Sequence, residues 1–388
     1  MPSPYRIGLG EASGAVADLG VLVPLGAALI LVNGLDAGAV LLGAGLLVVS
    51  SGLFFRIPFP VQPLKALAAV AVAEGLAPGV IHAAGFEIAA FLLLLSIRGF
   101  ADAIARLFTK PVVRALQLGV GVLLVITALK ITTDPPDVFS GTPPSPWPVL
   151  LALASLASVA WAARHRRYAL ALLLLVGGIG SAWAIAHPSL SGPALHLPAL
   201  SFPSTHAFAV AFFLLVIPQL PLTFGNAVVA VNDLAHEYFG DAARRVRPSR
   251  VCLSCAAGNV TSALIGGMPM CHGAGGLTAH VRLGARTAGM NLLLGSVLIG
   301  LGLFFAPQVP TILGLLPVWA LAGFLAYAGI RHGLLVADLR GYELAVASVT
   351  GAIGAYLGNL AITAALALVA VHSVRLVVPV LKRRRAEA

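Results

Sequence analysis

Two short stretches interrupt apolar sequence that is otherwise long enough to cross a membrane. The first is Pro58–Lys65, with the sequence PFPVQPLK, and the second is Gly266–Gly276, with the sequence GGMPMCHGAGG. Lipid supplies no hydrogen bonds, so irregular backbone at membrane depth is tolerated only inside protein or along a water-filled cavity. A pair of segments interrupted by Gly and Pro in corresponding halves of a chain is typical of secondary transporters and indicates their binding site.

The composition places the chain in a lipid bilayer. It is 59% hydrophobic and only 10% charged, with a mean hydropathy of +0.98, whereas soluble domains carry about 25% charged residues. The net charge of +10 does not indicate nucleic acid, because the basic residues form no surface interleaved with aromatic residues. No GxxxxGK[ST] loop occurs, so transport driven directly by ATP is not expected. Cys252 and Cys255 form a CxxC pair, but without a second pair they are expected to be small core residues and not a metal or redox site, and no cofactor is expected.

Apolar runs divide the chain into segments that are suited to helices. A spanning helix needs about 20 residues, or fewer where it crosses half of the bilayer. The sequence therefore predicts an all-α polytopic membrane protein with 14 transmembrane segments. These segments cover residues 12–33, 37–55, 63–77, 79–97, 111–131, 148–163, 168–187, 206–232, 251–266, 272–284, 286–306, 309–330, 342–357 and 358–380.

The distribution of positive charge predicts the orientation of these segments. With the N-terminus in the cytoplasm, every Lys and Arg except Lys65 and Lys130 falls on the cytoplasmic side, as the positive-inside rule requires. Seven segments precede the linker at 188–205 and seven follow it, so the second half enters the membrane upside down. We therefore expect a 7+7 inverted repeat in the cell membrane, with both termini cytoplasmic and the binding site between the halves.

The two interrupted segments are predicted to be half-helices that meet at the midplane. In the third segment the chain is expected to be extended to Gln62 and helical from Pro63, where the missing N–H of proline costs nothing. In the tenth it is expected to be helical from about His272. Each helix start exposes unpaired N–H groups and about half a positive charge. Two such ends make an anion site, and glycines let the backbone approach the ligand closely.

Four stretches carry a resemblance to a known family. They are PFPVQPLKALAA (58–69), GGMPMCHGAGGLTAHVRLGARTAG (266–289), Glu11–Gly20 and Pro218–Asn226. Together they resemble the signature motifs of the molybdate transporter family, a branch of the sulfate permease (SulP) superfamily. The likeness covers essentially the whole chain. It departs from the usual pattern at Leu64, where Met is commoner, and at Val281 and Leu283, where aromatic residues are usual.

The resemblance implies a division into two domains and the uptake of a tetrahedral oxyanion. The core domain would comprise residues 1–100, with spans 1–4, and residues 204–306, with spans 8–11. The gate domain would comprise residues 101–190, with spans 5–7, and residues 307–381, with spans 12–14. A cytoplasmic STAS domain is expected to be absent, as is usual for this branch. The oligomeric state stays open, a homodimer through the gate domain being one option.

The candidate substrate-binding residues lie in the two motifs and in the eighth segment. A charged side chain inside the membrane is energetically costly unless it has a partner or a function. Lys65 is therefore predicted either to attract the anion or to pair with Asp18 or Glu87. Gln62 either donates to the anion or caps the helix. His272 donates either to the anion or to a neighbouring span. The full set is Gln62, Pro63, Leu64, Lys65, Cys271, His272, Gly273, Ala274, Gly275, Gly276, Gln219, Thr223 and Asn226.

Polar residues elsewhere in the spans have alternative interpretations. In the eighth segment, Gln219, Thr223 and Asn226 either line the path or satisfy backbone groups that Pro218 and Pro221 free. Carboxylates within spans repel an anion unless they are protonated, so Glu87 and Asp18 are candidate proton carriers, with Glu87 preferred.

A cytoplasmic loop is predicted after the eighth segment. Its acidic residues, Asp233, Glu237 and Asp241, lie close in sequence to several arginines. They are expected to form solvated ion pairs with Arg244, Arg245 and Arg247.

The leading functional hypothesis is a secondary active transporter that imports molybdate by alternating access, coupled to protons. Sulfate and tungstate are expected competitors, and a dianion suits Lys65 and two positive helix ends better than a neutral nucleobase does. A sulfate transporter of the same fold and a passive anion channel remain as alternatives. An enzyme with Cys271 and His272 as nucleophile and base is disfavoured, because adjacent residues at a helix start point in different directions.

Overall fold

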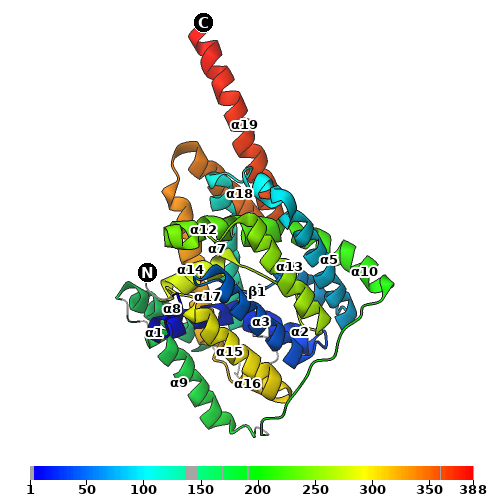
Figure 1. The fold of residues 1–388 in the computed structure, drawn as a ribbon. Helices are drawn as coiled ribbons and strands as arrows, with labels where there is room; N and C mark the ends of the chain where they lie inside the picture. The colour runs from blue at the N-terminus through cyan, green and yellow to red at the C-terminus, as the bar shows by residue number, and fades with distance from the viewer. Residues whose placement is uncertain are drawn as a thin grey trace.

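The structure is a computed structural model that describes residues 4–135, 147–165, 167, 169–189, 192–358 and 360–387. The described chain is almost entirely helical (Figure 1). Each of the fourteen predicted segments coincides with one helix or with a run of consecutive helices. Among the described residues, five helices are long and apolar enough to cross a bilayer, or up to seven if each of two bent pairs is one span. These helices fit the predicted multi-pass class, while the fourteen-segment repeat remains a prediction.

The bounds of the elements are as follows. The first half contains α1 (Leu9–Ala15), η1 (Val16–Asp18), α2 (Leu19–Leu31), α3 (Ala37–Phe55), β1 (Gln62–Pro63), α4 (Lys65–Ala73), α5 (Pro78–Ser96), η2 (Ile97–Gly99), α6 (Phe100–Ala105), α7 (Lys110–Thr133), α8 (Trp147–Arg164) and α9 (Ala169–Ala186). The second half contains α10 (Thr205–Ala211), η4 (Phe212–Val216), α11 (Ile217–Leu222), η5 (Thr223–Ala230), α12 (Val231–Phe239), η6 (Gly240–Ala243), α13 (Pro248–Leu264), β2 (Met270–Cys271), α14 (Ala274–Arg282), α15 (Gly289–Phe304), η7 (Ala306–Gln308), α16 (Val309–Gly314), α17 (Val318–Gly333), η8 (Leu334–Asp338), α18 (Gly341–Tyr356) and α19 (Leu360–Glu387).

Local sequence explains where several of these helices begin. Pro78 is the first residue of α5 and Pro248 the first of α13, while Pro111 is the second of α7. Proline is favoured there because the first N–H groups of a helix have no partner within the helix. The carboxylate of Asp36 caps α3 by accepting a hydrogen bond of 2.6 Å from the N–H of Ala39. These signals place the helix starts independently of tertiary packing.

The expectation of an all-α chain is corrected by one small sheet. Strands β1 and β2 pair antiparallel, with Gln62 opposite Cys271. Just beyond the pair, the N–H of Leu64 donates to the carbonyl of Pro269 at 3.2 Å. The sheet forms because two extended segments at membrane depth must satisfy their backbone groups within the protein.

Both half-helices begin two residues later than predicted. Helix α4 starts at Lys65 instead of Pro63, and α14 starts at Ala274 instead of His272. Pro63 lies in β1, so it does not occupy the first helical turn as expected. The pairing of the strands keeps these residues extended for longer than their own helix signals would predict.

The eighth predicted segment is an irregular helix. Two π-helical stretches, η4 and η5, flank the short helix α11, which contains Pro218 and Pro221. Proline removes a helical hydrogen bond and π-helical turns accommodate such interruptions, so the predicted loosening of this helix is confirmed. The twelfth predicted segment is also broken. It comprises α16 and α17, and α15 is bent by 100° relative to the run Ala306–Gly314.

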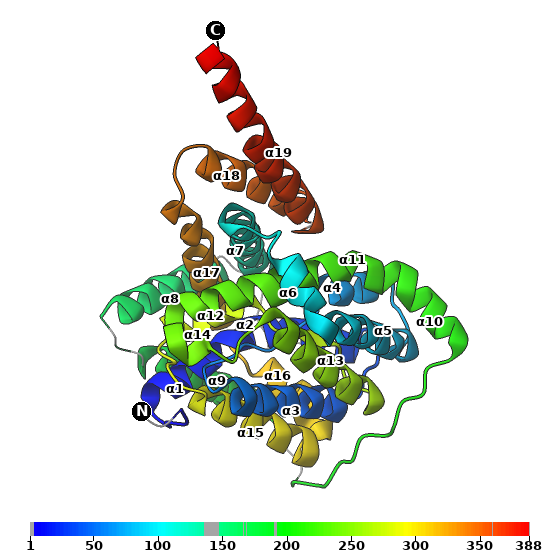
Figure 2. The same ribbon diagram turned by 45° about the horizontal axis from the view of Figure 1, so that its top comes forward.

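Helices from the two halves of the chain pack against each other throughout the molecule. Helix α3 packs along α15, α5 along α13, and α7 along α17 (Figures 1 and 2). Helix α17 also packs on α8, and α18 packs on α7. One hydrophobic core cluster extends through most of these helices. Helix α19 begins against α18 and α7, and its C-terminal end projects away from the rest of the molecule (Figures 1 and 2).

Candidate functional site

The starts of α4 and α14 meet at the short sheet. Because β1 and β2 are antiparallel and each leads directly into its helix, the two helix N-termini lie on either side of the strand pair. Among the described residues, the N–H groups of Lys65 and Ala66 in α4, and of Ala274, Gly275 and Gly276 in α14, have no hydrogen-bond acceptor. Free N–H groups at two converging helix starts are suited to bind an anion.

Two buried asparagines hold the extended backbone that precedes the half-helices. The side chain of Asn291 accepts from the N–H of Phe59 at 2.9 Å and donates to the carbonyl of the same residue at 2.6 Å. Asn259 does the same for Met270, at 2.8 and 2.7 Å. Each amide thus satisfies both backbone polar groups of one residue in the extended segments. Sequence reasoning missed both asparagines, although a strongly polar residue inside a predicted span is a detectable signal.

Asp18 is the centre of a buried polar network. The side-chain amide of Gln62 donates to its Oδ1 at 2.8 Å, and the N–H of Val61 donates to its Oδ2 at 3.1 Å. His280 Nε2 lies 2.8 Å from Oδ2. The ammonium of Lys65 donates to Gln62 Oε1 at 2.8 Å, so Gln62 links the cation to the carboxylate. The network ties η1, β1, α4 and α14 together.

His280 was not among the predicted residues. Its contacts determine which of its ring nitrogens carry hydrogen. Its Nδ1 lies 2.8 Å from the carbonyl of Gly14, which can only accept a hydrogen bond. Nδ1 must therefore carry hydrogen, while Nε2 faces the carboxylate of Asp18. The pair thus holds one shared proton, either as an imidazolium beside a carboxylate or as a neutral imidazole beside a carboxylic acid. In both forms the pair is electrically neutral overall.

Lys65 contacts neither of its two predicted acidic partners directly. In the described chain it makes no ion pair with Asp18 or Glu87, and its bond goes to Gln62 instead. Its side chain is half-buried. Since the Asp18–His280 pair is neutral, the positive charge of Lys65 is left without a counter-charge within this network. A cation without a counter-charge at a helix start is suited to an anionic ligand.

His272 is fully buried and its ring is held by protein atoms. Nδ1 lies 2.8 Å from the carbonyl of Pro60, and Nε2 lies 3.0 Å from the hydroxyl of Ser254 on α13. A carbonyl can only accept, so Nδ1 donates to Pro60, while donation by His272 to the anion or to a neighbouring span stays a prediction. Cys271, its neighbour, is a buried free thiol in β2.

Gln219 of α11 serves as a cap for α4. Its Oε1 accepts a hydrogen bond of 3.0 Å from the N–H of Leu67, the third residue of that helix, and its amide donates to Thr223 at 2.9 Å. Gln219 therefore satisfies backbone freed at the half-helix rather than backbone freed in its own segment. Asn226 is buried and its Oδ1 has no partner among the described residues.

The glycines of the second motif are required by close packing. A Cβ on Gly276 would lie 2.5 Å from Asp18 Oδ1, and a Cβ on Gly273 would clash with the Gln62 side chain. A Cβ on Gly275 would lie 2.9 Å from a methyl group of Leu124 on α7. Two glycines thus make room for the Asp18 network, and Gly275 brings the start of α14 against α7.

Glu87 lies apart from the Asp18 network. It is half-buried on α5, and its Oε2 is buried without a hydrogen-bond partner among the described residues. The carboxylate can therefore accept a proton without breaking any contact of that oxygen within the described chain.

The predicted pairing of Asp233 and Glu237 with nearby arginines is wrong. Both carboxylates bond the guanidinium of Arg114 on α7, at 3.0 and 2.8 Å, and Asp338 joins them at 2.7 Å. Arg114 is only 2% exposed. The pairing crosses more than a hundred residues of sequence because α7, α12 and η8 converge here, which no local pattern reveals.

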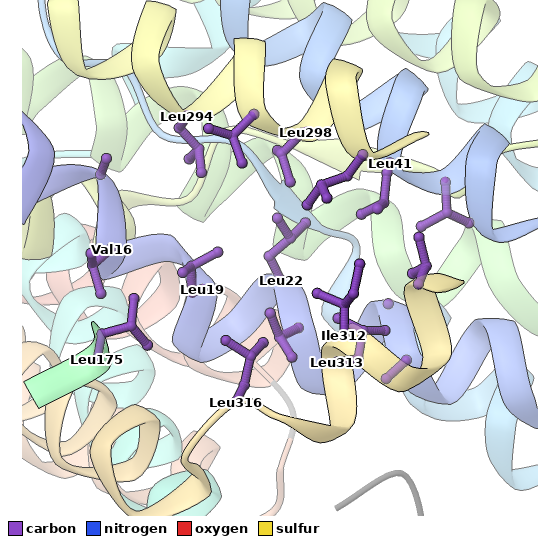
Figure 3. Close-up of a pocket in the computed structure, with 18 of the residues that line it drawn as sticks. Val16, Leu19, Leu22, Leu41, Leu175, Leu294, Leu298, Ile312, Leu313 and Leu316 are labelled. Atoms are coloured by element: carbon purple, nitrogen blue, oxygen red, sulfur yellow. The ribbon is translucent and has the colours of Figure 1, made fainter. Parts of the chain in front are cut away.

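A large apolar cavity lies elsewhere in the molecule. Its volume is about 420 Å³, and its walls are aliphatic side chains of α1, α2, α3, α9, α15 and α16 (Figure 3). It contains none of the charged residues of the network and offers no group that could bind an anion. In the described part of the chain, no group of three or more His, Cys, Asp or Glu side chains could hold a metal ion.

Comparisons with known proteins identify the family. A family model described as "Molybdate transporter of MFS superfamily" matches residues 10–124 and 211–331. Molybdate transporter 2 of Arabidopsis thaliana is 32% identical over 376 residues, which cover 86% of this chain and 80% of the plant protein.

Solved structures share the fold. The transmembrane domain of the cyanobacterial bicarbonate transporter BicA superposes with a TM-score of 0.57 at 17% identity, covering 92% of this chain and 96% of that one. The structure of SLC26A9 superposes with a TM-score of 0.56 at 16% identity, covering 95% of this chain and 65% of that one. These two structures show the fold, and the matching family is one of transporters and not of enzymes. The chain belongs to the molybdate transporter family, as its two interrupted motifs predicted.

Proposed function

We propose that this protein is a secondary active transporter that imports molybdate across the cell membrane by alternating access. The observation that carries the proposal is the meeting of the α4 and α14 N-termini beside Lys65. A tetrahedral dianion suits this place, since free N–H groups and one cation surround it. Relatives named as molybdate transporters, at about 30% identity, support molybdate as the substrate.

We infer that the chain is a 7+7 inverted repeat with both termini in the cytoplasm. In such a repeat each helix contact has a counterpart seven spans away. The packing of α3 on α15 (spans 2 and 11) corresponds to that of α13 on α5 (spans 9 and 4). The packing of α8 on α17 (spans 6 and 12) corresponds to that of α18 on α7 (spans 13 and 5). This reciprocity supports the repeat.

Alternating access would move the core domain, residues 1–100 and 204–306, against the gate domain, residues 101–190 and 307–381. The site lies at their boundary, because Gly275 of α14 packs against α7 and Thr278 bonds His332 of α17 at 2.9 Å. Arg114 makes a second connection, from the gate to Asp233 on α12. Motion of the core domain relative to the gate domain would have to break or rearrange these contacts. We therefore expect them to stabilise the present conformation relative to the other states of the transport cycle.

Within the predicted site we distinguish ligand contacts from framework. The N–H groups of Ala274, Gly275 and Gly276, together with the ammonium of Lys65, would contact the anion. Asn226, with its unpaired oxygen, would face the path. The other members of the predicted set would orient these groups: Gln62, Pro63, Leu64, Cys271, His272, Gly273, Gln219 and Thr223.

We propose that transport is coupled to protons and that Glu87 carries the proton, with Asp18 as the second candidate. A dianion entering a cell is opposed by the membrane potential, at about 4.6 kcal/mol for 100 mV. A passive channel would therefore hold internal molybdate more than a thousandfold below the external level. Accumulation against this potential needs coupling to the gradient of another ion, and among the described residues Glu87 has an unpaired oxygen that can take up a proton.

The test is uptake of radiolabelled molybdate into proteoliposomes that contain the purified chain. An inward proton gradient should drive accumulation above the external concentration, and collapse of the gradient with a protonophore should release the label. Uptake that only equilibrates would establish a channel. Parallel competition with tungstate and sulfate measures selectivity, and stronger inhibition by sulfate than by unlabelled molybdate would instead identify a sulfate transporter.

A further inference from the structure

A second cavity, separate from the half-helix site, lies between α8, α17 and the C-terminal end of α14. Its volume is about 750 Å³. Its charged lining consists of four arginines, and no acidic side chain lines it. These arginines are Arg164, Arg282, Arg286 and Arg331. Leucines and alanines of α8 form its apolar wall.

The four arginines are not neutralised by protein groups. Among the described residues none of them forms an ion pair with an Asp or Glu, in contrast to Arg114 and its three carboxylates. The Nε atoms of Arg282 and Arg331 are buried and have no acceptor in the described chain. The guanidinium of Arg286 bonds the carbonyls of Val281 and Ala285, and among the described residues only the backbone N–H of Arg286 contacts an acidic group, the carboxylate of Glu11 at 3.1 Å. A buried guanidinium donor without a partner is costly, and an anion in the cavity would satisfy it.

The position of the cavity relates it to the half-helix site. Helix α14 has nine residues, so the arginine at its C-terminal end lies about 13 Å from its N-terminus. Arg282 and Arg286 belong to the second signature motif, yet the half-helix site uses only the beginning of that motif. The cavity also lies between the proposed core, through α14, and the proposed gate, through α8 and α17.

We propose that these four arginines form a second oxyanion-binding site. Guanidinium groups bind tetrahedral oxyanions by paired N–H donors. The ligand is either a free oxyanion such as molybdate, sulfate or phosphate, or the phosphate of an anionic lipid whose chains follow the apolar wall. A role for this site in transport, as the place where the substrate binds just before its release into the cytoplasm, rests on the proposed function. Binding of an oxyanion at the site does not depend on that function.

The experiment measures the local potential with a cysteine reporter at Ala160, a wall residue of the cavity. Purified chain carrying Ala160→Cys is treated with thiosulfonate reagents bearing either a sulfonate or a trimethylammonium group. A unit charge about 7 Å away in water changes the local concentration of a monovalent ion about threefold before salt screening. We expect the anionic reagent to react faster, and Arg282→Gln with Arg331→Gln to lower the anionic-to-cationic rate ratio about fivefold or more at low salt.

Two controls isolate the cavity. Removing two arginines outside it, with Arg244→Gln and Arg247→Gln, should leave the ratio at position 160 nearly unchanged. A reporter at the exposed Ala337 should not respond to the loss of Arg282 and Arg331. The three native cysteines are buried, and the chain without a reporter measures their background.

The source of the oxyanion is separated by lipid composition. In phosphatidylcholine vesicles, protection of position 160 by added molybdate, sulfate or phosphate identifies a free oxyanion. Protection that requires phosphatidylglycerol and ignores added oxyanions identifies a lipid headgroup. Either result supports the site, provided that the two arginine substitutions abolish it. Equal rates for both reagents, with no protection by either source, would overturn the proposal.

The proposed function and this site fail separately. Labelling at position 160 requires no transport, so it remains informative even if the chain does not carry molybdate. Lys65→Met should lower uptake at limiting molybdate about tenfold or more and keep both the charge preference and the protection at position 160. Loss of protection in Lys65→Met would show that the anion binds only at the half-helices and would refute a second site.

Discussion

Replacement of Lys65 by Met tests the electrostatic basis of the half-helix site. Methionine keeps most of the volume of the stem and removes the charge, together with one hydrogen bond to Gln62. At an effective dielectric of about 20, a unit charge about 4 Å from a dianion contributes about 8 kcal/mol before desolvation. Lys65 is half-buried, so screening by nearby water and the cost of removing the hydration of both charges cancel most of this attraction. A remainder of about 1.4 to 3 kcal/mol would weaken binding about tenfold to a hundredfold.

Calorimetric titration of detergent-solubilised protein with molybdate measures this loss. Lys130→Met is the matched control, since Lys130 is the other lysine predicted to lie away from the cytoplasmic side and its side chain is exposed. Lys65→Arg should keep partial affinity because it keeps the charge. A thermal unfolding midpoint close to that of the parent would show that Lys65→Met is folded. If that variant binds molybdate as tightly as the parent does, the anion is held by helix N-termini alone and the reasoning is refuted.

Four further substitutions probe the framework and the coupling. Gly275→Val should abolish molybdate binding in the same titration, because its Cβ meets Leu124 and pushes the start of α14 away from α7; wild-type affinity would refute this packing argument. Gln219→Leu leaves the N–H of Leu67, the third residue of α4, buried and unpaired. Thermal unfolding should therefore show that the free energy of unfolding falls by about 1–3 kcal/mol. An unchanged unfolding midpoint would mean that the cap is dispensable. Glu87→Gln should keep binding and lose the dependence of uptake on a proton gradient, while Asp18→Asn should lose binding as well; pH-driven accumulation in both variants would exclude both carboxylates as proton carriers.

The half-helices were predictable from sequence because their causes are local. Three prolines within Pro58–Pro63, and glycines close to Pro269 in 266–273, disfavour regular helix, so the two breaks follow from local sequence. The predicted helix starts at Pro63 and His272 were nonetheless two residues early. The delay comes from the pairing of β1 with β2, which joins residues more than 200 positions apart. The local helix and strand propensities of either segment cannot predict this pairing.

Contacts between distant residues account for what sequence reasoning missed. His280 and Asp18 are 262 residues apart, and only the packing of α14 against η1 brings them together. Arg114 bonds Asp233 across 119 residues, whereas proximity in sequence favoured arginines that follow Asp233 directly. The residue types were informative in each case, since polar groups inside spans need partners. Their partners could not be chosen without the fold.

The contacts of the two candidate carboxylates favour Glu87 over Asp18 as the proton carrier. The oxygens of Asp18 face three groups, the Gln62 amide, the Val61 N–H and His280. The first two can only donate to it, so an added proton must either go to His280 or break a contact that aligns the half-helix start. With the Asp18–His280 pair neutral, Lys65 and two helix ends of about half a charge each nearly balance a dianion. The proton therefore need not sit beside the anion, and the unpaired oxygen of Glu87 can receive it without disturbing the network.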